Sequence, residues 1–155
     1  MLIHTLIVED DPITQAALRE TLDGDDFHTT CVGTAIEASI AMQRASFDAM
    51  VLDLSLPDSS PRQTIQRGRV WAKLIPIVIL SGHLPDDERE LVNAEFHAVM
   101  EKRDAFFPVA RAALRATIHS AVLHRERIRA LTGQRAGLVR VSNALASLDR
   151  LLARA

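Results

Sequence analysis

Five short apolar runs alternate along the chain with longer stretches in which apolar and polar residues recur at helical spacing. The runs cover residues 2–8, 27–32, 49–52, 75–80 and 98–100. The first, third and fourth contain near-continuous aliphatic residues, as strands do when helices cover both of their faces. Strands that alternate with helices are joined by right-handed crossovers and pair in parallel. The pattern therefore predicts a doubly wound α/β fold around a five-stranded parallel sheet.

Local signals indicate where the helices between these strands begin. Asp11 stands before Pro12, a combination of N-cap residue and proline at the first helical position. Residues 34–37 (TAIE) and 60–63 (SPRQ) have the spacing of capping boxes. Asp104 is placed to cap the last helix. We therefore expect helices to start directly after each of these residues or segments.

Polar and charged residues follow four of the five predicted strands. Glu9 and Asp10 follow the first strand, Asp53 ends the third, Ser81 ends the fourth and Lys102 follows the fifth. The carboxyl ends of parallel strands share one edge of the sheet, and ligands bind beyond that edge. We therefore expect these five side chains to converge there.

The residue types at this edge suit the chemistry of phosphate. Converging carboxylates repel one another unless a cation lies between them, and Glu9, Asp10 and Asp53 would supply the hard oxygen ligands that Mg²⁺ accepts. The Lys102 ammonium and the Ser81 hydroxyl can hold an oxyanion. Together these groups favour phosphoryl transfer to an aspartate. The plainer interpretation of Asp10 is that it helps to cap the first helix.

The motifs around these residues add a resemblance to a known family. The chain contains LIVEDDP at 6–12, VLDLSLPD at 51–58, IPIVILSG at 75–82 and a lysine at 102. In this order and spacing they resemble the response-regulator receiver (CheY-like) family of bacterial two-component systems, over about three-quarters of the chain. The resemblance implies a flavodoxin-like sheet with strand order 2-1-3-4-5.

The resemblance also implies roles for the site residues. Asp53 would accept a phosphoryl group from a histidine kinase or a phosphotransfer protein. Asp10 and Asp53 would bind Mg²⁺ directly, together with the backbone carbonyl of Ser55, and Glu9 would act through water. The chain would then signal to a downstream protein target through protein contacts, without being a turnover enzyme.

The same resemblance assigns the phosphoryl oxygens to Ser81 and Lys102, and it leaves an alternative function open. Three residues before the lysine, many receivers have an aromatic residue, and this chain has Val99. The alternative is a pseudo-receiver, a phosphorylation-independent scaffold with the same fold. A hydrolase with an aspartyl nucleophile is disfavoured, because haloacid dehalogenases have an acid two residues after the nucleophile and this chain has Ser55.

Composition indicates the cellular compartment of the protein. Its one cysteine, Cys31, excludes an intrachain disulfide and fits a reducing compartment. No apolar run approaches the roughly 18–20 residues of a membrane span, and the N-terminus lacks the basic start of a signal peptide. These observations predict a cytoplasmic protein without a membrane partner.

Charge divides the chain into two parts. Residues 1–103 contain 9 Lys and Arg against 17 Asp and Glu, whereas residues 104–155 contain 9 Arg against 3 acidic residues. The helical pattern from Asp104 extends to about Thr132, where Gly133 is expected to interrupt it. We therefore predict a receiver domain over residues 1–122 and a helical C-terminal extension over residues 123–155.

The extension contains a short apolar repeat. The repeat consists of Leu138, Val141, Leu145, Leu148 and Leu152, at alternating spacings of three and four residues. Such a seam must be buried against another surface, so we predict a homodimer in which the extension forms part of the interface. Two alternatives are an amphipathic helix folded back on its own domain and a linker to a further segment. Nucleic acid is not the expected partner, because neither interleaved aromatic residues nor a known DNA-binding motif accompanies the arginines.

Overall fold

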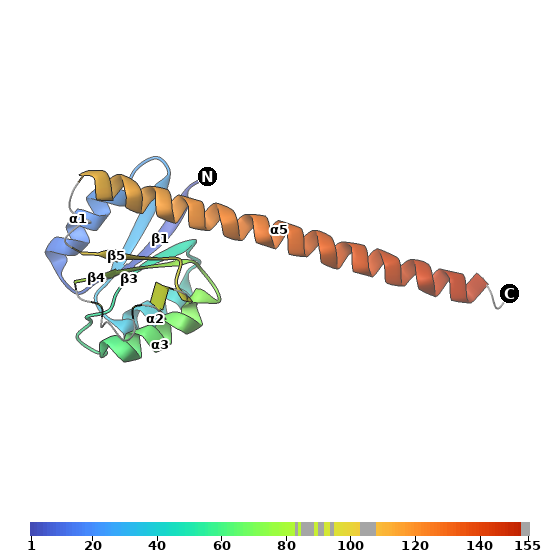
Figure 1. Ribbon diagram of the computed structural model, residues 1–155, viewed down its shortest axis with the longest axis horizontal. Helices are drawn as coiled ribbons and strands as arrows, with labels where there is room; N and C mark the ends of the chain where they lie inside the picture. The colour runs from blue at the N-terminus through green and yellow to red at the C-terminus, as the bar shows by residue number, and fades with distance from the viewer. Residues whose placement is uncertain (83, 85–88, 90–91, 94, 103–107, 153–155) are drawn as a thin grey trace. The chain divides into compact units, whose positions relative to one another are not determined.

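A single parallel sheet of five strands lies at the centre of the computed structural model, in the order β2-β1-β3-β4-β5 (Figure 1). The structure describes residues 1–82, 84, 89, 92–93, 95–102 and 108–152, and for residues 108–110 and 135–152 it describes the backbone alone. The strands are β1 (Ile3–Val8), β2 (Phe27–Val32), β3 (Ala49–Asp53), β4 (Ile77–Ser81) and β5 (Ala98–Glu101). The helices are α1 (Pro12–Leu22), α2 (Ala35–Arg44), α3 (Pro61–Ala72) and α5 (Pro108–Leu152). The predicted fold class and strand order are confirmed.

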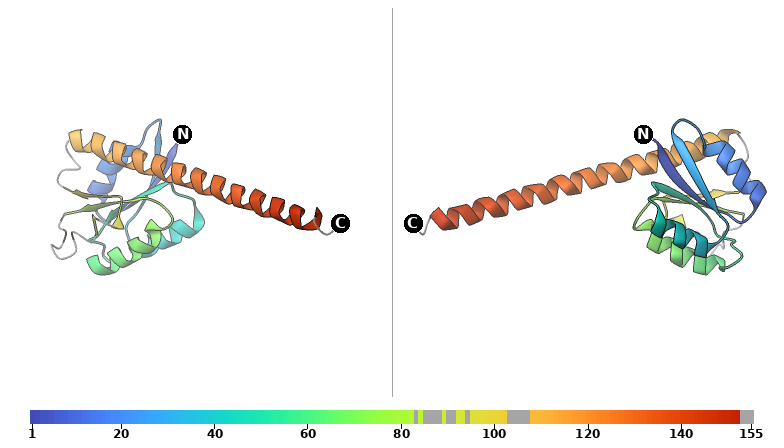
Figure 2. Two further views of the ribbon diagram at one scale, coloured as in Figure 1. Left: turned by 45° about the vertical axis from the view of Figure 1, so that its right-hand side comes forward. Right: turned by 180° about the vertical axis from the view of Figure 1, so that it is seen from behind.

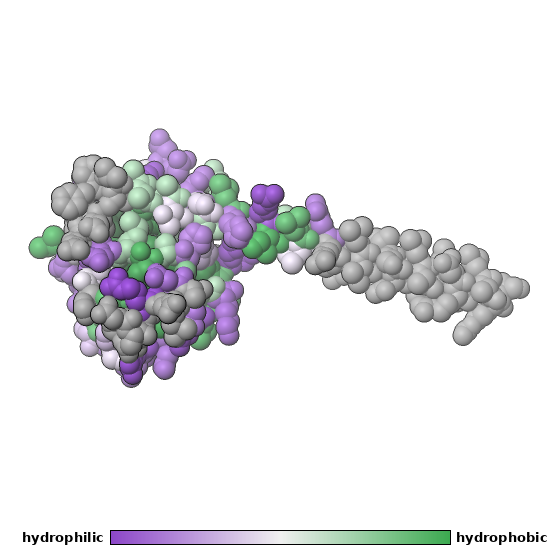
Figure 3. Space-filling view, in the orientation of Figure 1, coloured by the Kyte–Doolittle hydropathy of each residue, from purple (hydrophilic) through white to green (hydrophobic). Residues whose placement is uncertain are grey.

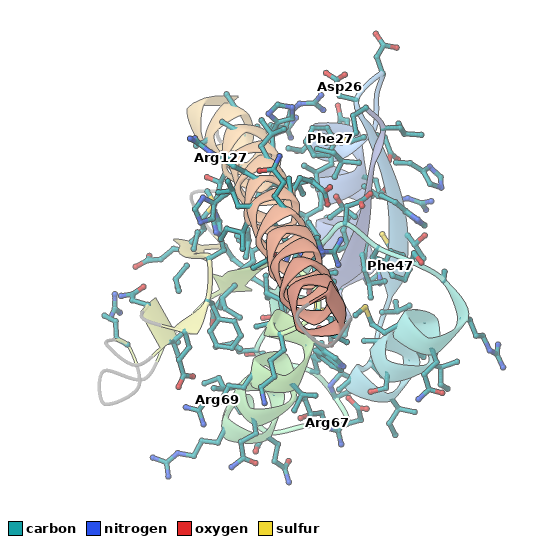
Figure 4. The ribbon with its side chains drawn as sticks, turned by 90° about the vertical axis from the view of Figure 1, so that its right-hand side faces the viewer. Asp26, Phe27, Phe47, Arg67, Arg69 and Arg127 are labelled. Atoms are coloured by element: carbon teal, nitrogen blue, oxygen red, sulfur yellow. The ribbon has the colours of Figure 1, made fainter. Side chains whose placement is uncertain are left out.

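Two apolar layers bury both faces of this sheet. The part of α5 up to Val122 lies with α1 on one face, and α2 and α3 lie on the other (Figures 1 and 2). Phe27 belongs to the first layer and Phe47 to the second, and Figure 4 shows Phe47 on the side of α2. Because these layers cover both faces of its central strands, β1, β3 and β4 are almost entirely buried, which explains their near-continuous apolar runs.

The predicted N-caps of α1 and α3 are confirmed. The Asp11 carboxylate accepts hydrogen bonds from the Thr14 backbone N–H at 2.9 Å and from the Thr14 hydroxyl at 2.6 Å. Ser60 and Gln63 form a complete capping box, in which each side chain accepts a hydrogen bond from the other residue's backbone N–H. Asp104, the predicted cap of the last helix, lies outside the described residues.

The capping box predicted at the start of α2 is half wrong. Thr34 accepts a hydrogen bond from the Glu37 backbone N–H at 3.0 Å, as expected. The Glu37 carboxylate, however, accepts from the Gly33 N–H at 2.8 Å. The glutamate side chain is long enough to reach the amide that precedes the cap residue, so the return bond ties the end of the β2–α2 connection to the helix.

A glycine in α3 makes room for an aromatic ring from the segment before β5. A methyl group at Gly68 would lie 3.0 Å from the Phe96 ring and 3.2 Å from Leu52. Phe96 itself is buried. Next to this contact, Arg69 forms an ion pair with Glu95, and Figure 4 shows Arg69 on α3. The glycine and the ion pair together hold residues 95–96 against α3.

The chain divides into two compact units, Met1–Val122 and Leu123–Ala155. In the first unit, Leu114, Ile118 and Val122 of α5 are buried in the core. The prediction that Gly133 interrupts the helix is wrong, because α5 continues through it to Leu152. Each glycine inside a helix costs only about 1 kcal/mol relative to alanine, and the other residues of the long α5 helix offset this cost at Gly133 and Gly137.

The second unit exposes apolar side chains. Leu123, Ile128 and Leu131 are 49%, 49% and 57% exposed, and Figure 3 shows apolar side chains among polar ones on the described part of this helix. The apolar repeat at 138–152 lies on the helical backbone, but its side chains are outside the described set. Among the described residues, no helix combines the length and apolar character needed to cross a bilayer.

The contact between Gly68 and Phe96 predicts the effect of adding a methyl group to α3. Gly68→Ala should lower the free energy of unfolding by about 1–3 kcal/mol, because the crowding outweighs the gain in helix propensity. The matched control is Gly133→Ala, where an added methyl group meets nothing within 4 Å. Urea unfolding followed by circular dichroism measures both variants, and a stabilised Gly68→Ala protein would contradict the packing described here.

Candidate functional site

Three acidic side chains meet at the carboxyl edge of the sheet. Val8 pairs with Leu52 across β1 and β3, so the next residues along these strands, Glu9 and Asp53, lie level with each other. Glu9 and Asp53 are each 1% exposed, whereas Asp10 is exposed. Their carboxylate oxygens lie within 4.8 Å of one another. The three acids therefore converge as expected from the sequence.

Lys102 supplies a cation to this group of acids. Its backbone N–H donates to the Ser81 carbonyl at 3.0 Å, one residue beyond the end of β5. Its ammonium donates to Asp53 Oδ2 at 2.7 Å and to Glu9 Oε1 at 3.0 Å. The same nitrogen lies 2.8 Å from Glu9 Oε2. A single ammonium therefore faces both buried carboxylates.

Burial and pairing act in opposite directions on these groups. Burial raises the pKa of Glu9 above its usual value, although hydrogen bonds from Lys102 and from the Asp11 amide oppose the shift. Burial of the Lys102 ammonium disfavours its charged form, but the hydrogen bonds to Asp53 and Glu9 outweigh burial and raise its pKa. Lys102 therefore stays protonated at neutral pH, and the site keeps its cation.

The loops around the acids are fixed by backbone hydrogen bonds. The Ser55 N–H donates to Asp53 Oδ1 at 3.1 Å, and the Asp11 N–H donates to Glu9 Oε1 at 3.1 Å. The Glu9 N–H donates to the Val32 carbonyl at 3.0 Å and continues the pairing of β1 with β2. The two acids are therefore held by main-chain atoms, which keeps their carboxylates in place without a ligand.

Ser81 is buried at the last position of β4. The preceding residue, Leu80, pairs with Asp53, so Ser81 lies one residue beyond the position opposite that aspartate. Ser55 is exposed and follows Asp53 by two residues. All six residues named from the sequence as site residues therefore lie at the carboxyl ends of their strands. The function of each remains a prediction.

The donor set fits a divalent cation of the Mg²⁺ type. It consists of carboxylate oxygens on Glu9, Asp10 and Asp53, the ligand type that Mg²⁺ prefers. Glu9 Oε2 is buried 2.8 Å from the Lys102 ammonium, and no other group among the described residues donates a hydrogen bond to it. Among the described residues, three carboxylates lie near one ammonium, so the group carries a net negative charge that a divalent cation would neutralise.

One residue that joins the loop after Asp53 to the start of α2 was not identified from the sequence. The Asp58 carboxylate, in the loop between β3 and α3, accepts hydrogen bonds from the Ala35 and Ile36 backbone amides at 2.9 and 3.0 Å. Its partners are 23 and 22 residues away in the chain. No local pattern could have indicated this contact, because it depends on how α2 and the loop meet in the fold.

Comparison with known proteins agrees with this geometry. The family model that describes the response regulator receiver domain matches residues 5–118. The chain belongs to the response regulator receiver family. This match confirms the family resemblance of the sequence motifs. Receivers are signalling modules of two-component systems.

Individual relatives match this receiver over part of their length. It is 34% identical over 84 residues to the transcriptional regulatory protein PmrA of Pectobacterium parmentieri, covering 54% of this chain and 38% of that protein. It is 34% identical over 92 residues to the swarming motility regulation protein RssB of Serratia marcescens, covering 59% of this chain and 41% of that protein. The chain thus spans about two fifths of the length of these two curated relatives.

Solved receiver structures match the fold over more of the chain. A CheY-like receiver domain from Methylobacillus flagellatus is 28% identical with a TM-score of 0.62, covering 78% of this chain and 99% of that one. A receiver domain protein from Methanospirillum hungatei has a TM-score of 0.69 at 20% identity, covering 82% and 98%, which supports the fold alone.

The shared ammonium predicts what its removal does to stability. Lys102→Met should lower the free energy of unfolding by about 3 kcal/mol in a buffer without divalent ions, because two buried carboxylates lose their cation. The control is Lys73→Met at the exposed end of α3, which should change it by less than about 0.5 kcal/mol. Equal losses in urea unfolding of the two variants would contradict the role given to Lys102.

Proposed function

We propose that this receiver is a phosphorylation switch in which Asp53 accepts a phosphoryl group from a histidine kinase or a phosphotransfer protein. The observation that carries the proposal is a buried Asp53 carboxylate, 2.7 Å from the Lys102 ammonium and grouped with two further acids. Asp10, Asp53 and the Ser55 carbonyl would hold Mg²⁺ directly, and Glu9 would hold it through water. Ionisable groups that converge in a buried place, with a shifted pKa as for Glu9 and Lys102, are typical of functional sites.

The proposed transfer uses the groups already in place. A carboxylate oxygen of Asp53 attacks the phosphorus of a phosphohistidine, the P–N bond breaks, and its electron pair leaves with the imidazole nitrogen. The product is an acyl phosphate on Asp53. Asp10, Asp53 and the Ser55 carbonyl would hold Mg²⁺, which would supply neutralising charge for the transfer. Lys102 exchanges its pairing with the free carboxylate for the phosphoryl oxygens, and Ser81 holds the same group.

The output would be a change in protein contacts. A phosphoryl group adds about −1.5 to −2 charge at the carboxyl edge, enough to shift the loops that surround it. The receiver would pass this change to a downstream protein target in the cytoplasm. The chemistry modifies the protein itself once per signal, so the receiver would not act as a turnover enzyme.

We further propose a homodimer in which residues 123–155 take part. The support is the exposed apolar side chains at Leu123, Ile128 and Leu131, together with the leucine repeat that follows on the same helix. Apolar side chains at coiled-coil spacing are stabilised when a second helix covers them. The extension would then mediate dimerisation of the receiver. Nucleic acid would not be its partner.

A second function, that of a phosphorylation-independent scaffold, is supported by one observation. Val99, where many receivers have an aromatic residue, is half-buried against the apolar layer of α2 and α3. An aliphatic side chain at this position cannot swing as a ring does, so it removes one route of coupling between the site and the surface. The two functions differ in whether Asp53 takes a phosphoryl group at all.

Phosphorylation at Asp53 is tested by intact mass. Incubation with acetyl phosphate and Mg²⁺ should add the mass of one phosphoryl group, because the carboxylate is positioned as a nucleophile. Asp53→Asn should abolish the gain, and Asp26→Asn, at an exposed acid before β2, should retain it. If neither acetyl phosphate nor a phosphorylated kinase domain gives a gain in mass, the scaffold function is the better account.

The homodimer is tested by size-exclusion chromatography with light scattering at micromolar concentration. The expected mass is twice the chain mass of 17.1 kDa. Leu145→Asp, inside the leucine repeat, should shift the mass to that of the monomer, because a charge at a coiled-coil core position opposes association. The control is Asn143→Asp, which lies outside the repeat on the same helix. A monomeric wild-type protein would rule out this interface.

A further inference from the structure

Asp58 joins two parts of the receiver that are distant in sequence. It belongs to the connection between β3 and α3, which begins directly after Asp53. Its Oδ1 and Oδ2 atoms accept hydrogen bonds from the Ala35 and Ile36 amides, in the first turn of α2. These amides have no partner within their own helix, so Asp58 caps α2 from outside it.

The contact is electrostatically favourable. A carboxylate at a helix N-terminus is stabilised by the free N–H groups and by the helix dipole. Partial burial opposes ionisation of Asp58, but the Ala35 and Ile36 amides outweigh it and lower its pKa. Asp58 is therefore charged at neutral pH and holds its end of the loop by two charge-assisted hydrogen bonds.

A second residue caps the same helix from its own segment. Thr34 accepts the Glu37 amide at 3.0 Å and is a local cap, because it directly precedes α2. The first turn of α2 thus has one cap from its own segment and one from the β3–α3 loop. Only the second can transmit a restraint to the residues that follow Asp53.

The loop between Asp53 and Asp58 carries a proposed metal ligand. Ser55 lies between two buried side chains, Leu54 and Leu56, which are 0% and 7% exposed. These leucines hold one side of the loop in the core, and Asp58 holds its far end against α2. The Ser55 carbonyl belongs to the short stretch between these anchors.

We propose that Asp58 is a positioning residue for the metal and phosphoryl site, and that it acts by clamping the β3–α3 loop to the first turn of α2. The inference rests on the proposed function, because it assigns the loop a ligand role. Residues that orient metal ligands without touching the metal typically change affinity by 10- to 100-fold when they are removed. Leu54 and Leu56 keep part of the loop in place, so the smaller effect is expected here.

The test compares Asp58→Ala and Asp58→Asn with the matched control Thr34→Ala in the full chain. Both alanine variants remove a cap from α2, and each should raise the unfolded fraction in urea by about fivefold. Only Asp58→Ala should weaken Mg²⁺ binding, by about tenfold in isothermal titration calorimetry. Asp58→Asn keeps one acceptor oxygen and should lie between Asp58→Ala and the wild-type protein.

Hydrogen exchange gives a second measurement that needs no metal. In Asp58→Ala, the backbone amides of residues 54–56, 58 and 59 should exchange faster than in the wild-type protein, whereas in Thr34→Ala they should not. If Thr34→Ala weakens Mg²⁺ binding as much as Asp58→Ala, or if Asp58→Ala binds Mg²⁺ within twofold of the wild-type protein, Asp58 is only a helix cap and the proposal is wrong.

The proposed function can fail separately. A wild-type protein that binds Mg²⁺ but takes no phosphoryl group would refute the switch, and the affinities of the Asp58 and Thr34 variants would still decide the positioning role. A wild-type protein that binds no Mg²⁺ would overturn the positioning role directly.

Discussion

Two buried carboxylates that share one ammonium are the constraint on which the rest of this receiver depends. Glu9 and Asp53 lie 1% exposed at the ends of neighbouring strands, where their charges would repel without the Lys102 ammonium between them. Burying charge in this way costs free energy that a well-packed apolar side chain would avoid. The proposed phosphorylation of Asp53 would explain why the fold retains such a group, and the main-chain hydrogen bonds from Ser55 and Asp11 keep the carboxylates in position.

The remainder of the domain makes this arrangement possible. Apolar layers cover both faces of the sheet, so the carboxyl edge is where polar side chains can meet each other and solvent. The parallel register sets Glu9 level with Asp53, and Lys102 reaches them from β5 across the intervening β4. The order of the strands therefore decides which loops come together, and these loops carry the proposed site.

Gly68 and Asp58 are explained by their partners in space. Gly68, an unfavourable residue inside a helix, leaves the room that the Phe96 ring occupies, and the Arg69–Glu95 ion pair lies beside them. Asp58 stands in a loop without a glycine and completes the cap of α2. Gly68 gives space to a ring from another segment, and Asp58 gives hydrogen-bond acceptors to the free amides of another helix. Contacts between distant segments therefore connect α3 with residues 95–96 and the β3–α3 loop with α2.

The sequence by itself determined the strands, the caps of α1 and α3, and the six residues at the carboxyl edge. Strand and helix periods and caps are encoded within a few neighbouring residues, and a parallel sheet brings the ends of its strands to one edge. The tertiary structure alone decided that Lys102 pairs with both Glu9 and Asp53 and that Asp58 caps α2. It also decided that Gly68 receives Phe96. These contacts join residues far apart in the chain, so their energies depend on how packed elements meet. The continuation of α5 through Gly133 differs from the predicted break because Gly133 and Gly137 together cost the helix less than its other residues contribute.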